Sequence, residues 1–292
     1  MHWRLVKEMP TIPLSQDQID TFWRDGHLAI HDFIDQSQID RITQTFHRLF
    51  LTRAGWKEGN FFDLAGSEDD GQLKLPQLLH PAKYAPELLR TIFWANAEAV
   101  AKDILGPSVQ FYFDHALNKA PHPESATPWH QDQAFARAGS RIDNITIWLP
   151  LQDVDEENGC LTFIPGSHMT GIMPHRNYKD DKRIEGLEAI GVNLSNAVTV
   201  PMRKGSVSIH HSRTLHYAGP NLSSRPRKVY AVVFAVEREE PVVPVDYSWN
   251  VDKPTARQKR QLDFDKRLIT RTQRSIKKAF RNTIYSIMGK PA

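Results

Sequence analysis

Two short segments carry residues whose types and spacing suit a metal ion. His130 and Asp132 stand two residues apart in the run PWHQD, and His216 lies in a distant segment. In an extended strand side chains alternate between faces, so His130 and Asp132 should point the same way. Two histidines and one carboxylate on one face of a metal ion leave other positions open, as in non-haem Fe(II) oxygenases. His210 and His211 are alternatives to His216, so residue types alone leave the third ligand open.

Composition restricts the class of protein. The chain has 292 residues, of which 40% are hydrophobic and 24% charged, as in ordinary globular proteins. A single cysteine, Cys160, excludes an intrachain disulfide and a multi-cysteine zinc site, and it fits a reducing compartment. The N-terminal residues lack the apolar core of a signal peptide, and no apolar run approaches membrane-spanning length. We therefore expect a cytoplasmic protein without integral membrane association.

Charge is distributed unevenly along the chain. The chain has 37 Lys/Arg and 34 Asp/Glu; twelve of these basic residues and two of the acids lie between Lys253 and Lys290, which leaves 25 basic against 32 acidic residues elsewhere. Apolar residues recur at helical spacing in this region, so residues 252–292 are predicted to form a basic amphipathic helical tail. Such a helix could bind an anionic surface, or it could dock on the acidic body or across a homodimer interface. We favour docking, and we expect no nucleic-acid partner because no nucleic-acid-binding motif is present.

The first hundred residues are predicted to be mainly helical. Ser15 and Gln18 have capping-box spacing, so a helix should begin at Ser15 and end near residue 25. A strand is expected over 27–34, followed by a helix that begins at Ser37. The polar stretch 61–77 is predicted to be a loop. A further helix is expected over 87–105, because the Gly-Pro pair that follows is a typical helix stop.

The pattern changes to short β-strands after residue 109. Turn signals separate the apolar and β-branched runs, among them Asn158-Gly159, a pair that favours a tight hairpin turn. Few helices are expected between these strands, which favours a mainly β protein with a double-sheet jelly-roll core and flanking helices. The predicted strands cover 109–119, 145–151, 161–164, 197–200, 207–210 and 229–236.

Several motifs together resemble one enzyme family. They are PWHQDQ at 128–133, IWLPL at 147–151, ENGCL at 157–161, PGSH at 165–168, and the segment 205–216 with Pro220-Asn221 and Arg227 behind it. In this order and spacing they are similar to the phytanoyl-CoA dioxygenase family, across roughly residues 19–236. The resemblance implies a double-stranded β-helix (jelly-roll, cupin-like) fold over residues 1–251. It also implies the cofactor Fe(II), the co-substrate 2-oxoglutarate, and O₂ as oxidant.

The resemblance also implies roles for single residues. His130, Asp132 and His216 match the iron ligands, and His216 is preferred over its two neighbours because Arg227 follows it at the family spacing. Arg227 matches the position that pairs with the far carboxylate of 2-oxoglutarate, and a planar guanidinium suits that task. Its rival is Arg225, two residues earlier on the chain.

Two further positions are implied near the co-substrate. Trp148 matches a family tryptophan beside 2-oxoglutarate, although ordinary packing between the sheets explains it equally well. His115 falls where family members place a co-substrate contact on the preceding strand. Family-related halogenases have a small residue in place of Asp132, so a carboxylate there favours hydroxylation, or another oxidation such as desaturation or ring closure, over halogenation.

The expected function is oxidation of an unactivated C–H bond in a small-molecule substrate, with succinate and CO₂ as co-products. The substrate itself is not indicated, and an acyl-CoA 2-hydroxylase in the narrow sense is one alternative. A non-catalytic jelly-roll protein with a metal site, or a zinc hydrolase, would be a different class. Neither gives Arg227 a role, so we favour the oxygenase.

Overall fold

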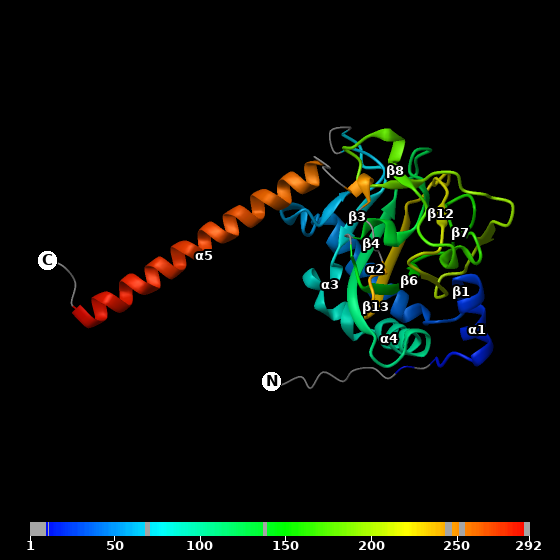
Figure 1. Ribbon diagram of the computed structural model, residues 1–292, viewed down its shortest axis with the longest axis horizontal. Helices are drawn as coiled ribbons and strands as arrows, with labels where there is room; N and C mark the ends of the chain where they lie inside the picture. Colours follow the sequence, from blue (N-terminus) through cyan, green and yellow to red (C-terminus); the bar gives the residue numbers. More distant parts are fainter. Residues whose placement is uncertain are drawn as a thin grey trace.

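Two antiparallel sheets packed face to face form the body of the protein (Figure 1). A computed structural model describes residues 10, 12–67, 71–136, 139–242, 247–250 and 255–288. Within these residues one sheet has seven strands and the other four, and β8 (His175–Asn177) pairs with β9 (Leu187–Ala189) as a separate ribbon.

The larger sheet lies between the helices and the smaller sheet. Its order, from edge to edge, is β1 (His27–Ile30), β11 (Val207–His211), β6 (Ile142–Pro150), β13 (Arg227–Glu237), β4 (Gln110–Lys119), β3 (Pro76–Leu79) and β2 (Phe61–Asp63). The smaller sheet has the order β10 (Val198–Val200), β7 (Leu161–Phe163), β12 (His216–Ala218) and β5 (Thr127–His130). The predicted loop over 61–77 was wrong at both ends, because its buried aromatic residues extend the sheet as β2 and its last residues begin β3.

Alternation along β6 separates two cores. Ile145, Ile147 and Leu149 face one way and join the cluster that includes the helices, while Trp148 faces the smaller sheet and packs in the second cluster. Thr146 has the same parity as Trp148 and therefore also faces the smaller sheet. The space between the two sheets is thus lined by the even-numbered residues of this strand.

Helices cover the outer face of the larger sheet. They are α1 (Gln16–Asp25), α2 (Gln36–Leu51), α3 (Pro81–Tyr84) and α4 (Ile92–Leu105). The capping box predicted at Ser15 is present, and Gly26 ends α1 in the left-handed conformation. The helix predicted over 87–105 is divided at Thr91, whose extended backbone ends a 3₁₀ turn and whose side chain caps α4.

Short 3₁₀ helices complete the connections. They are η1 (Trp56–Glu58), η3 (Pro86–Arg90), η4 (Asp132–Phe135), η5 (Ser167–Met169), η6 (Tyr178–Asp180) and η7 (Ser248–Asn250). η4 begins at one of the candidate ligands, directly after β5 ends.

The long helix α5 (Ala256–Met288) projects away from the body (Figure 1). Its first turns are held by Arg257, which donates to the carbonyl of Gly59, and by Arg260, whose guanidinium lies 3.8 Å from the ring centre of Trp56. Further along, the apolar side chains of Leu262, Leu268, Ile269 and Ile276 are exposed. Of the two docking alternatives, docking along the body of its own chain is therefore wrong beyond the first turns, and docking across a homodimer interface stays a prediction. No helix in the described part of the chain combines the length and apolar character that a membrane crossing requires.

Candidate metal centre

Three of the predicted side chains meet between the two sheets. His130 and His216 are cross-strand partners on β5 and β12, with ring centres 4.1 Å apart. The Oδ1 atom of Asp132 lies 3.5 Å from Nε2 of His130 and 3.7 Å from Nε2 of His216. These ligand atoms all lie within 4.8 Å of one another, which is the geometry of a group that could hold a metal ion.

The local backbone differs from the predicted single strand. β5 ends at His130, and Asp132 is the first residue of η4. Gln131 between them keeps an extended backbone, and this is enough to place the two side chains on one side. Gln131 is fully buried, and its side-chain amide donates to the carbonyls of Gly171 and Arg213. The strand therefore ends at a turn that the surrounding loops hold in place.

Backbone carbonyls set the orientation of both imidazoles. Nδ1 of His130 lies 2.8 Å from the carbonyl of Pro128, and Nδ1 of His216 lies 2.9 Å from that of Thr214. A carbonyl only accepts, so Nδ1 carries a hydrogen in each ring, and Nε2 is the nitrogen that has the lone pair when the ring is neutral. Both histidines thus turn toward Asp132 the nitrogen that binds a metal in metal-binding histidines.

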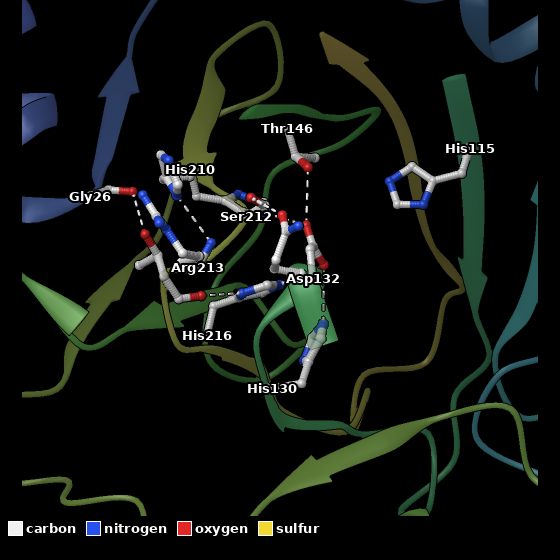
Figure 2. A network of polar contacts seen from close by, with 12 residues as sticks. Gly26, His115, His130, Asp132, Thr146, His210, Ser212, Arg213 and His216 are labelled. Carbon is white, nitrogen blue, oxygen red and sulfur yellow. Dashed lines mark hydrogen bonds and ion pairs between the residues drawn. The ribbon is translucent and has the colours of Figure 1, made fainter. Parts of the chain in front are cut away.

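The second carboxylate oxygen of Asp132 faces the larger sheet. Thr146 on β6 donates to Oδ2 at 3.0 Å, and Nε2 of His210 on β11 lies 3.3 Å from the same atom. Figure 2 shows Thr146 and His130 on opposite sides of the carboxylate. Asp132 therefore connects the two sheets through its two oxygens, and its side chain is 28% exposed.

The charges at this centre suit a divalent cation. Burial by itself raises the pKa of Asp132, but the imidazoles of His216, His130 and His210 outweigh it and hold this pKa well below its usual range. Burial, together with the neighbouring histidines, lowers the pKa of His216 well below its usual value. One anionic carboxylate and a neutral imidazole are the protonation states that metal ligation requires.

A buried cation lies in the same interior. Arg227 opens β13 and is 1% exposed, and its Nε and Nη1 atoms have no hydrogen-bond partner within the described residues. Burial lowers its pKa to about 9, so it still carries its charge at neutral pH. Its guanidinium carbon lies 5.3 Å from the ring centre of Trp148, in cation–π range. A buried and unpaired guanidinium is costly unless an anion joins it, so this position fits a carboxylate ligand.

Neighbouring strands place other unpaired polar atoms on the same face. Cα pairing runs from Ser208 to Trp148, then to Ala231 and to His115. Oγ of Ser208 and Nε2 of His115 are buried and have no hydrogen-bond partners among the described residues. Nδ1 of His115 lies 3.0 Å from the amide nitrogen of Gln77, and burial lowers the pKa of His115 to about 4. Figure 2 places His115 apart from the metal-binding cluster, so it is not brought to the metal.

Arg225, Arg227 and Lys119 differ in burial and in the partners of their charged groups. Arg225 is exposed, whereas Arg227 is buried. Lys119 lies opposite Arg227 on β4 and is also buried, but its ammonium donates to the carbonyls of Ala218 and Gly219. Within the part of the chain that the structure describes, Arg227 is thus a buried cation whose Nε and Nη1 atoms lack partners.

Sequence reasoning missed the polar side chains that support the site. Thr146 was counted only as part of a strand, and His210 was considered only as a competing ligand. Thr146 could have been found as a polar residue with the same parity as Trp148 in an otherwise apolar run. His210 gave no comparable signal, because its contact depends on how two sheets pack.

Comparison with known proteins agrees with this arrangement. A family model described as Phytanoyl-CoA dioxygenase (PhyH) matches residues 22–229. The phytanoyl-CoA dioxygenase domain-containing protein 1 homolog of Dictyostelium discoideum is 30% identical over 274 residues, which covers 81% of this chain and 96% of that protein. A probable alpha-ketoglutarate-dependent hypophosphite dioxygenase of Stutzerimonas stutzeri is 23% identical over 225 residues, covering 75% of this chain and 77% of that protein.

One solved structure has a similar fold over most of this chain. The crystal structure of EvdO2 from Micromonospora carbonacea var. aurantiaca, complexed with 2-oxoglutarate, gives a TM-score of 0.66 at 31% identity. The match covers 81% of this chain and 97% of that one. The prediction of a jelly-roll core with flanking helices is thereby confirmed. The matched family region, residues 22–229, includes the metal-binding cluster and Arg227.

Proposed function

Because the chain belongs to the phytanoyl-CoA dioxygenase family, we propose that it hydroxylates an unactivated C–H bond of a small-molecule substrate. The chain is an Fe(II)- and 2-oxoglutarate-dependent dioxygenase. Its cofactors are Fe(II), 2-oxoglutarate and O₂, and succinate and CO₂ are the co-products. Desaturation or ring closure would use the same centre, and the choice between them depends on the substrate.

We assign the iron ligands to His130, Asp132 and His216. Bound Fe(II) supplies the activation of O₂ and the oxidising power for C–H cleavage. Two neutral imidazoles and one carboxylate are the donor set of this chemistry, and the carbonyl contacts at both Nδ1 atoms orient the rings for it. His130 and His216 are both buried, which limits the access of water to their rings.

We assign the far carboxylate of 2-oxoglutarate to Arg227. The observation that carries the proposal is that this buried guanidinium, with two donor atoms unpaired within the described residues, lies against Trp148 on the inner face of the larger sheet, which faces the sheet that carries His130 and His216. Trp148 packs against the guanidinium and so limits where its donors point. His115 is proposed as a further contact, because its unpaired Nε2 is buried on the same inner face.

Anaerobic titration of the Fe(II)-loaded protein with 2-oxoglutarate tests this function. We expect the weak visible charge-transfer band of the chelated complex to grow to saturation. Zn(II)-loaded protein is the matched control, because Zn(II) is d¹⁰ and has no such transition. Protein that binds Fe(II) but never develops the band would indicate a binding module or a hydrolase instead.

We propose that residues 1–251 form the oxygenase domain and that 252–292 form an appended helical tail. A chain that ends at Gln261 should keep the melting temperature and Fe(II) affinity of the full chain, because it retains the Arg257 and Arg260 contacts. A chain that ends at residue 254 should melt earlier, since these contacts lie against η1 and β2. Thermal unfolding of the three proteins checks this, and equal melting temperatures would show that the tail contacts do not stabilise the body.

Compartment and assembly complete the proposal. A cytoplasmic location is supported by the single cysteine, Cys160, which is a buried free thiol. The exposed apolar residues of α5 support a homodimer formed through this helix.

A further inference from the structure

Three imidazoles turn Nε2 toward the Asp132 carboxylate, but they differ in whether this nitrogen carries the hydrogen. His130 and His216 use Nδ1 to donate to backbone carbonyls, which leaves a lone pair on Nε2. Nδ1 of His210 has no hydrogen-bond partner in the described ranges of the chain, and its Nε2 lies 3.3 Å from Oδ2 of the Asp132 carboxylate. A carboxylate only accepts, so the hydrogen of His210 is on Nε2. His210 therefore has the opposite tautomer, which donates to Asp132 and offers no lone pair there.

The two carboxylate oxygens have different surroundings. Oδ1 faces the two Nε2 lone pairs from the smaller sheet. Oδ2 receives the hydroxyl of Thr146 and the imidazole N–H of His210, which come from neighbouring strands of the larger sheet. Thr146 and His210 are themselves cross-strand partners on β6 and β11, so their separation is set by the sheet. Both donors are fixed before any metal arrives, because each is almost fully buried.

We propose that His210 and Thr146 are positioning residues that hold Asp132 as a ligand through one oxygen only. Their two hydrogen bonds occupy Oδ2, so the carboxylate cannot rotate to offer both oxygens to the metal. This inference rests on the proposed function, since it gives Asp132 the role of iron ligand. A single-oxygen Asp132 leaves three metal positions, the number that two-point binding of 2-oxoglutarate and one O₂ require.

Packing also keeps His210 in this orientation. Its ring centre lies 5.6 Å from that of Phe163 and 4.5 Å from that of His216. On the neighbouring strand β1, His27 is its cross-strand partner and stacks on Phe163 at 4.4 Å, and within the described part of the chain it makes no hydrogen bond or ion pair with Asp132. His27 is therefore a half-buried histidine of the same region that lacks the proposed role.

The test compares four variants by anaerobic calorimetry with Fe(II) and by the visible spectrum of the Co(II)-loaded protein. His210→Phe keeps the ring packing but removes the donor, and Thr146→Val removes the hydroxyl. His210→Gln keeps a donor at the position of Nε2, and His27→Phe is the matched control. Partners that orient a metal ligand contribute on the order of 10–100-fold to metal affinity. We expect His210→Phe and Thr146→Val each to weaken Fe(II) binding by about 10-fold or more.

The remaining variants separate hydrogen bonding from packing. His210→Gln should stay close to wild type in Fe(II) affinity, and so should His27→Phe. The Co(II) spectrum of His210→Phe should change in band position and intensity, because the released Oδ2 atom joins the coordination sphere.

The outcomes distinguish failure of the positioning role from failure of the proposed oxygenase function. Wild-type affinity and spectrum in a folded His210→Phe protein would overturn the positioning role, and so would His210→Gln that binds as weakly as His210→Phe. If His210→Phe does not fold, the Thr146→Val and His210→Gln proteins decide the question by the same two measurements. A wild-type protein that does not bind Fe(II) at all would instead contradict the proposed function.

Discussion

We expect Asp132→Ala to abolish Fe(II) retention and 2-oxoglutarate turnover while the protein remains folded. The substitution removes the anionic ligand and leaves two neutral imidazoles, which hold a divalent cation far more weakly. The apo protein should lose some stability but remain folded, because the imidazoles that hold the pKa of Asp132 low lose their partner while the strand pairing around the site is kept. His130→Ala and His216→Ala should also lose the metal.

The measurement is iron content after gel filtration, together with succinate formation and thermal unfolding of the apo protein. Asp40→Ala, which removes an exposed carboxylate of α2, is the control and should behave as wild type. Normal turnover in any of the three ligand variants would remove that residue from the assignment. A large loss of apo stability in Asp132→Ala would mean that its contacts to the two sheets hold the fold together.

Arg227→Met should weaken 2-oxoglutarate binding by on the order of 100-fold, whereas Arg225→Met should change it little. Removal of one partner from a buried ion pair costs about 3–5 kcal/mol, and each 1.4 kcal/mol corresponds to a tenfold change in Kd. Methionine keeps most of the side-chain volume, so the contact with Trp148 is partly preserved. Arg227→Lys should fall between wild type and Arg227→Met, because lysine keeps the charge but loses the planar fork.

The anaerobic charge-transfer titration gives these dissociation constants directly. Fe(II) affinity, measured separately, should be unchanged in all three variants, which distinguishes loss of the co-substrate from loss of the metal. Weaker binding in Arg225→Met than in Arg227→Met would mean that the exposed arginine has the proposed role. Equal affinity in all variants would place the co-substrate carboxylate elsewhere in the interior.

Local sequence determined much of the candidate site. The spacing of His130 and Asp132 needs only an extended Gln131 to bring the two side chains together, and this holds although the strand ends between them. Strand alternation also placed Trp148 on an inner face, where it meets Arg227. These features depend on neighbours within a few residues, so periodicity and motif spacing predict them. The ordered motifs added the family, and with it the preference for His216.

Only the tertiary structure decided the rest, because those contacts join segments far apart in the chain. The helix predicted over 87–105 is divided where the side chain of Thr91 caps a new helix. The stretch 61–77 joins a sheet because a strand edge was available for it. The role of His210 follows from a carboxylate on one sheet that meets a strand of the other. Arg227 is buried because it opens β13, a central strand paired on both sides, whereas Arg225 precedes the strand and is exposed. The sequence by itself thus determined which residues can do the chemistry, and sheet packing decided which atoms they present to it.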